Sequence, residues 1–359
     1  MSLIAAPDVV DVVDKDLLDR IEQARGTSGY QFTILACKAE QERRNSIAGN
    51  ARDRRRRLSI RDAIERGPVA MHDMRHIHSV LAICGLPYKR LPPAVRDFER
   101  KQGNMALDVS AGFLRDPNGN KMIQPVPFGP KARLILMHLC SEAIRQKSAT
   151  IDIAETFTGF VRDLGFSDSG GKRGPLTAFK EQLNALSACT MRMSVWTGER
   201  VRTRTITPIE EIDLWLAANP GQRSLWPSTV TFSPTMYESL KRHAVPVNVK
   251  AVKAFAGSAR KLDLYFWLGY RMHNIDRSTH MPWTTLAQQF GDGYTRLRDF
   301  QAAMHDDLKS ILEVFPDAPV RIDEYGLTIA PAGPEVLALP TRRVRSEEHT
   351  SELQSHLNL

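Results

Sequence analysis

Five polar side chains recur at three- and four-residue steps within residues 294–309, so they would share one face of a helix. These side chains are Tyr294, Arg298, Gln301, His305 and Lys309. Arginine can donate to guanine edges, glutamine can pair with adenine, and lysine can neutralise phosphate, so such a face suits the major groove of duplex DNA. Asp306 and Asp307 lie beside this face and would oppose a polyanion. A solvated amphipathic helix is the alternative interpretation.

A second group of polar and basic residues lies on and just before a helix that is expected to begin at Pro175. Its outer face would carry Thr177, Lys180, Glu181 and Asn184. Lys172 and Arg173 come just before it, where free N–H groups and the positive end of the helix dipole favour phosphate. Bases would be contacted by Thr177, Lys180 and Asn184 here, and by Arg298, Gln301 and His305 in the later helix.

Alternation places Arg200, Arg202 and Arg204 on one side of a strand in a hairpin that turns at Thr197-Gly198. A hairpin wing that contacts the DNA backbone or the minor groove needs such a row. Cross-strand ion pairing is the alternative. Among the basic residues, Lys172, Arg173, Arg202, Arg204 and Lys309 are expected to contact phosphates and to set the salt dependence of binding.

The elements that would position these residues occur twice, in residues 128–209 and 249–330. Each series has an apolar helix, a short strand, a second helix, an amphipathic helix and a β-hairpin. In the second copy, residues 251–272 would form one helix, and Leu297 would begin the inward stripe of the amphipathic helix. The order is typical of a winged helix, so we expect an α+β fold with two tandem winged-helix domains. The expected domains are a helical, basic N-terminal region at 1–106, a first winged-helix domain with a preceding hairpin at 107–215, and a second at 225–332.

The two ends of the chain differ from this middle part. Residues 7–25 have the pattern of an amphipathic helix, and residues 43–66 are strongly basic and predict a helix or a disordered arm. Within them, Arg54–Arg57 could contact nucleic acid or simply be solvated. Residues 345–356 resemble the translation of a sequencing-adapter oligonucleotide, so 345–359 are expected to be an artefact tail, with a genuine disordered tail as the alternative.

Composition limits the remaining classes. The 359 residues include 49 Lys and Arg against 41 Asp and Glu, a formal charge of +8 that favours a polyanionic partner. Four widely spaced cysteines predict free thiols in a reducing compartment. The first residues are acidic where a signal peptide would be basic, and no apolar run approaches the ~20 residues of a membrane helix. We expect a cytoplasmic protein with no membrane association.

Three enzyme-like patterns are weak. Residues 165–172 have the wrong spacing for a phosphate loop, and Arg173 replaces its hydroxyl residue. His72 and His76 lack further metal ligands nearby. The triplet His76-Ile77-His78 and Tyr237 match the elements of metal-dependent nicking initiators, but a predicted winged helix separates them in the sequence. We therefore expect no catalytic site, no metal and no cofactor.

Several segments resemble the plasmid-encoded RepA replication initiators. They are GPKARLILMHLCSEAIRQ, KRGPLTAFKEQLNALSACTMRMSV, VTFSPTMYESLKRHAVPVNVKAVKAFAGSARKLDLYFWLGYR and MPWTTLAQQFGDGYTRLRDFQAAMHDDLKSILEVFPDAPVRI. They match in order across residues 112–330, and the first hundred residues are not covered.

The resemblance implies an initiator that binds repeated sites in double-stranded plasmid origin DNA and recruits host replication proteins, a helicase or an initiator. It also implies a homodimeric form that represses its own gene. A winged-helix transcriptional repressor is the main alternative, and a His-hydrophobe-His nicking initiator is the third.

Overall fold

The structure is a computed structural model that describes residues 11–67, 70–116, 118–153, 156–166, 175–212 and 229–339. The chain forms two compact units, Met1–Ser59 and Ile60–Leu359. Helices and several small antiparallel sheets make up the described part, which confirms the α+β class. Residues 172, 173 and 340–359 lie outside the described residues.

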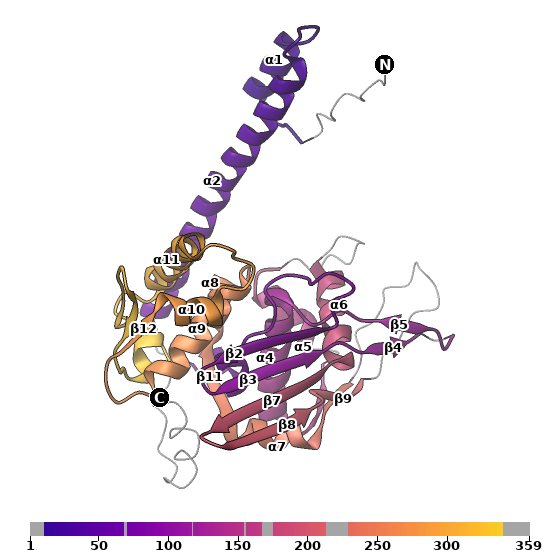
Figure 1. The fold of residues 1–359 in the computed structure, drawn as a ribbon, viewed down its shortest axis with the longest axis vertical. Helices are drawn as coiled ribbons and strands as arrows, with labels where there is room; N and C mark the ends of the chain where they lie inside the picture. Colours follow the sequence, from indigo (N-terminus) through magenta and orange to yellow (C-terminus); the bar gives the residue numbers. More distant parts are fainter. Residues whose placement is uncertain are drawn as a thin grey trace. The chain divides into compact units, whose positions relative to one another are not determined.

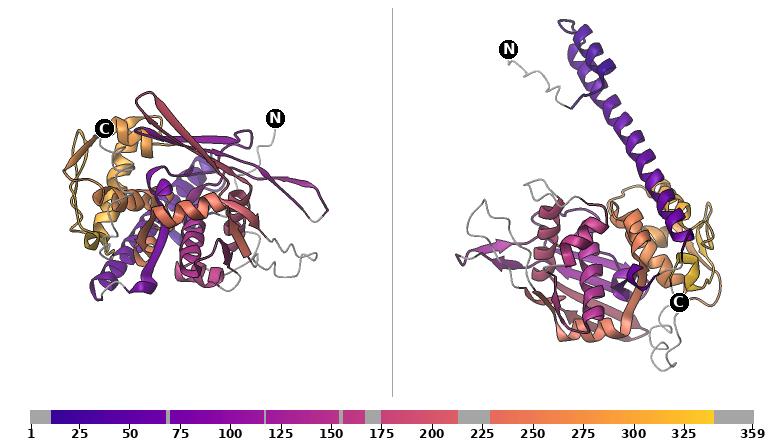
Figure 2. Two further views of the ribbon diagram at one scale, coloured as in Figure 1. Left: turned by 90° about the horizontal axis from the view of Figure 1, so that it is seen from below. Right: turned by 180° about the vertical axis from the view of Figure 1, so that it is seen from behind.

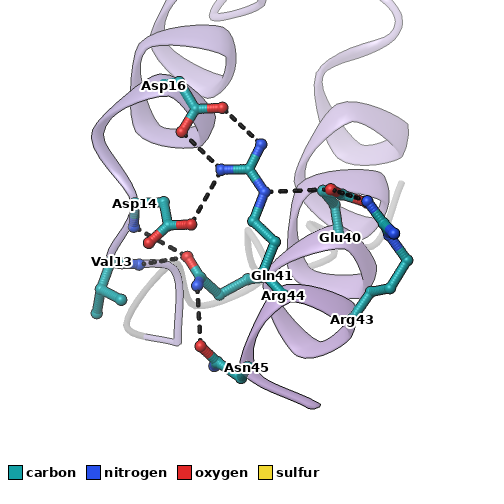
Figure 3. A network of polar contacts seen from close by, with 8 residues as sticks. All are labelled: Val13, Asp14, Asp16, Glu40, Gln41, Arg43, Arg44 and Asn45. Atoms are coloured by element: carbon teal, nitrogen blue, oxygen red, sulfur yellow. Dashed lines mark hydrogen bonds and ion pairs between the residues drawn. The ribbon is translucent and has the colours of Figure 1, made fainter. Parts of the chain in front are cut away.

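The first unit is built on α1 (Lys15–Gln23) and the start of α2 (Tyr30–Glu65). Its apolar core is small and consists of Val12, Leu17, Ile21, Ile34 and Cys37. A polar network joins the start of α1 to α2 (Figure 3). In it, the Arg44 guanidinium donates to Asp14 at 3.0 Å and to both carboxylate oxygens of Asp16 at 2.8 Å. Helix α2 includes nearly all of the basic segment 43–66, so the expectation of a helix, and not that of a disordered arm, is confirmed.

A four-stranded antiparallel sheet with the order β2-β3-β7-β8 lies on one side of the second unit, in front of its helices in Figure 1. Its strands are β2 (Asp97–Gln102), β3 (Met105–Ser110), β7 (Thr190–Thr197) and β8 (Arg200–Ile206). The turn between β7 and β8 contains Gly198 at φ +56°, a conformation that glycine adopts without a steric penalty. One face carries buried Leu107 and Met191 and lies against helices, as Figure 2 also shows.

Next to this sheet lie a helix, a strand, two helices and two further strands, with the β7–β8 hairpin inserted in the chain before the last two strands. They are α4 (Gly129–Gln146), β6 (Thr150–Asp152), α5 (Thr156–Asp163), α6 (Pro175–Ala188), β9 (Ile209–Ile212) and β10 (Thr229–Phe232). The strands form a sheet in the order β6-β10-β9. The expected hairpin β7–β8 exists, but its predicted place as the strand pair that closes this repeat is wrong. Its backbone groups pair with β3 instead, and β10 pairs with β6.

The same order of elements recurs later in the chain. The elements are α9 (Ala259–Met272), β12 (Thr279–Pro282), α10 (Trp283–Phe290), α11 (Leu297–Val314), β13 (Val320–Ile322) and β14 (Gly326–Ile329). The sheet order β12-β14-β13 repeats the earlier one, with the first strand beside the third. The prediction of one helix over 251–272 is wrong. The chain breaks into α8 (Val249–Phe255) and α9, because Gly257 interrupts the helix and the Ser258 side chain caps α9 by accepting from the Lys261 N–H.

Shorter elements connect these parts. They are η1 (Met71–Asp73), β1 (Met74–His78), α3 (Ser79–Ile83), β4 (Phe113–Arg115), β5 (Lys121–Ile123), α7 (Pro234–His243), β11 (Ala244–Asn248) and η2 (Pro334–Leu337). Strand β1 pairs with β11, which is far away in the sequence, and β4 pairs with β5 as a hairpin that precedes α4. No helix in the described ranges is long and apolar enough to cross a membrane. All four cysteines are free thiols and buried.

Candidate nucleic-acid interface

The solvent-facing side of α11 carries the side chains that the sequence placed there. The exposed side chains are those of Arg298, His305 and Lys309, and the Gln301 side chain is half-buried. Phe300 and Met304 point the other way and are buried. Arg298 forms an ion pair with Asp299, Nε to Oδ1 3.4 Å, but both side chains are more than half exposed, so the pair contributes little. The cations of this face therefore stay available to a partner.

Three other expectations for this helix are wrong. Leu297 is 42% exposed, because α11 begins there and the buried stripe starts with Phe300. Asp307 does not lie beside the outer face but is buried, where Arg260 of α9 forms an ion pair with it. Tyr294 precedes the helix, and its hydroxyl accepts from Arg260 at 2.5 Å. The buried Asp307 therefore does not oppose a polyanion at this surface.

A groove of about 500 Å³ runs between α11 and β13. Its lining includes Leu308, Leu312, Val320 and Ile322, with His305, Lys309, Glu313 and Arg321. Arg321 is exposed between two half-buried neighbours of its strand and lies close to the predicted face of α11. Arg321 was not among the predicted residues, although the alternation of Val320, Arg321 and Ile322 was a usable signal.

The corresponding helix α6 is less exposed than expected. Thr177 is exposed, whereas Lys180 and Asn184 are half-buried, and burial lowers the pKa of Lys180. The Glu181 carboxylate is 2.7 Å from the Arg90 guanidinium, so the one acidic side chain among the predicted residues is neutralised. Lys172 and Arg173 lie outside the described residues, and their predicted contacts with phosphate stay predictions.

Strand β8 carries an arginine row on the edge of the four-stranded sheet. Arg200, Arg202 and Arg204 are exposed, and the residues opposite them on β7 are Thr197, Val195 and Met193. The expected arrangement on one side of the strand is confirmed. Because no acidic residue lies opposite, the strand register does not support the ion-pairing alternative. Burial, together with the charges of Arg242 and Arg204, lowers the pKa of His243 at the end of α7.

The comparison with protein families tests the resemblance to the RepA initiators. Residues 126–285 match the family model described as "Plasmid encoded RepA protein". The RepA resemblance is confirmed. This RepA segment contains α4, α6, β8 and α9, while α11 follows it.

Two further comparisons add little to the RepA match. A crystal structure of selenomethionine derivatives of domain 2 and domain 3 of RctB aligns over 70% of this chain and 98% of that chain. The identity is 12% and the TM-score is 0.44, which is a weak likeness. No curated protein matches the chain.

The elements of the nicking alternative are distant in the sequence, but the expectation that they are also separated in space is wrong. Strand β1 with His76 and His78 contacts α7, which carries Tyr237. Both ring nitrogens of His78 are engaged, however: Nδ1 accepts from the Val80 N–H at 3.2 Å, and Nε2 lies 2.9 Å from Ser239 Oγ. Within the described residues, no three His, Cys, Asp or Glu side chains are grouped as metal ligands. The residues therefore do not fit a metal that needs the His78 ring as a ligand.

Proposed function

We propose that this protein is a plasmid replication initiator that binds repeated sites in origin DNA through two tandem winged-helix domains. The observation that carries the proposal is the repeated sheet order, β6-β10-β9 and β12-β14-β13. In both parts the first strand follows one helix and precedes two more, and the β7–β8 hairpin is an insertion in the first part. In such a domain the third helix enters the major groove and the last two strands form the wing. The third helices are α6 and α11, and the RepA match supports the replication role.

In this arrangement the wings are β9–β10 and β13–β14, and β8 is an additional basic strand. The α11 face would contact bases through Arg298, Gln301 and His305, and phosphate through Lys309. Arg321 on β13 would join them from the wing. The α6 face would contribute Thr177, Lys180 and Asn184. The protein would act without a catalytic site or cofactor, as a homodimer when it represses its own gene, and would recruit a host helicase or initiator.

The test is fluorescence anisotropy of the full chain on duplexes that tile the DNA beside its gene, with a scrambled duplex as control and a salt series. The proposal expects a repeated element to bind about 10³-fold or more tightly than the scrambled duplex, with a steep salt dependence. Equal binding of all duplexes would reject it. Loss of plasmid copying when the gene is deleted would separate the initiator from a winged-helix repressor.

Arg298 and Lys309 are expected to respond differently to truncation, because one would contact a base and the other a phosphate. Arg298→Ala should cost about 1–3 kcal/mol on the preferred duplex and relax the preference at one base pair. Lys309→Ala should weaken binding to every duplex alike and reduce the salt slope by about 0.9. Anisotropy on single-base variants of the site measures both effects. Identical behaviour of the two variants would contradict the assigned helix face.

The arginine row on β8 is expected to contact phosphates only. Replacing Arg200, Arg202 and Arg204 together by alanine should lower the slope of log K against log salt by about 2.7, at about 0.9 per phosphate. The ratio between specific and scrambled duplexes should stay within about threefold. Thr203→Ala with Thr205→Ala, on the opposite face of the strand, is the matched control. An unchanged slope in the triple variant would show that the row only protects a sheet edge.

A further inference from the structure

The first helices of the two repeated parts meet at a buried ion pair. Arg133 is the fifth residue of α4 and Asp263 is the fifth residue of α9, so equivalent positions carry opposite charges. The Arg133 Nε donates to Asp263 Oδ1 at 2.5 Å and Nη2 donates to Oδ2 at 2.7 Å. Both residues are less than 5% exposed. A bidentate pair of this kind is satisfied in one relative orientation of the two helices.

The segment before β2 closes around this pair. Arg133 also donates to the carbonyl oxygen of Leu86 at 2.6 Å and to that of Pro87 at 3.3 Å. Gly85 lies so close that a Cβ at this position would be 2.0 Å from Asp263 Oδ2. The pair therefore has backbone partners on its open side, and the glycine leaves room for its carboxylate.

A second buried arginine extends the cluster toward α11. The Arg100 guanidinium of β2 donates to the carbonyl oxygen of Gln289 at the end of α10, and lies 3.5 Å from Asp292 in the turn before α11. The guanidinium carbons of Arg100 and Arg133 lie 4.8 Å and 5.4 Å from the centre of the Tyr88 ring. The cluster thus connects the sheet that contains β7 to the elements that begin α11.

We propose that the Arg133–Asp263 pair is a positioning device that fixes the orientation of α6 relative to α11. It would thereby set the spacing between the two half-sites, which are the DNA segments that α6 and α11 contact. Apolar side chains can pack in several neighbouring arrangements, whereas a buried ion pair is costly in any arrangement that separates its charges. The proposed effect on helix orientation follows from the structure alone, whereas the proposed effect on DNA spacing also rests on the proposed function.

The first test uses pulsed electron paramagnetic resonance to measure the distance between two nitroxide labels. The labels are attached to cysteines introduced by Thr177→Cys in α6 and Thr285→Cys in α10. Both threonines are exposed and the native cysteines are buried. The parent should give one narrow distribution. Arg133→Met with Asp263→Leu should broaden it, and Arg133→Lys, which keeps the charge but loses the bidentate geometry, should broaden it less. Arg260→Met with Asp307→Leu, a pair within the second repeat, should leave it unchanged.

The second test uses duplexes in which one base pair is added between the half-sites, which turns one half-site by roughly 35° relative to the other. The parent chain should lose about tenfold or more in affinity, and the Arg133→Met/Asp263→Leu variant less than about threefold. A distance distribution and a spacing profile of the Arg133→Met/Asp263→Leu variant that both match the parent would overturn the proposal. If the parent prefers no duplex, the proposed function fails, and the distance measurement alone decides on the positioning role.

Discussion

Asp263→Leu is expected to lower the free energy of unfolding by about 3–5 kcal/mol, because it leaves the Arg133 guanidinium buried without its carboxylate. The remaining acceptors, the carbonyl oxygens of Leu86, Pro87 and Gly129, are neutral and cannot balance the charge. Urea unfolding of the full chain, followed by circular dichroism, measures the loss. Two-state behaviour has to be checked, since the chain contains two compact units.

Replacing both partners should restore much of this stability. Arg133→Met with Asp263→Leu removes both charges and fills the site with apolar side chains of similar size, which is often neutral or stabilising. A double-mutant cycle should therefore give a coupling energy well above the ~0.5 kcal/mol seen for independent sites. A coupling energy near zero would mean that the two side chains do not depend on each other.

Local signals predicted the helices of this fold well, and failed where pairing depends on distant residues. The turn at Thr197-Gly198 correctly predicted the β7–β8 hairpin, because both strands alternate around a glycine. The sheet β6-β10-β9 was missed because residues 213–228 separate β9 from β10, and local alternation does not indicate that strands so far apart pair. The break before α9 was missed because the apolar pattern continues across Gly257 and Ser258, although a serine after a glycine is a helix-start signal.

The candidate site was predictable where exposure follows helix phase, as for Arg298, His305 and Lys309. It was not predictable where a partner from a distant part of the sequence determines whether a side chain is buried. Asp307 looks like an exposed acid in the sequence, and only the approach of Arg260 from α9 shows that it is buried. The same is true of Arg133, which sequence periodicity places among apolar residues without indicating its partner.

Acid is expected to destabilise the second unit through two buried histidines, of which His78 is the clearer case. Burial, helped by the nearby His243, lowers the pKa of His78 to about 3. The neutral ring is required because Nδ1 accepts from the Val80 N–H and caps α3, and a proton on Nδ1 would end that hydrogen bond. The unfolded chain binds a proton near pH 6.5, whereas the folded chain does not until about pH 3. Stability is therefore present above pH 6.5 and is lost as the pH falls below it.

Protonation of His138 on α4 in the unfolded chain should add an equal loss of stability. Burial lowers its pKa to about 4, and its ring stacks on Phe160 with the centroids 4.4 Å apart. Between pH 7 and pH 5 each histidine should cost about 2 kcal/mol, because the unfolded state alone gains the proton. Urea unfolding at both pH values measures the sum, about 4 kcal/mol. His138→Phe should remove about half of the difference, and His72→Ala, at an 84% exposed side chain, should leave it unchanged. A difference below about 1 kcal/mol in the parent chain would contradict the assignment of both rings as neutral and buried.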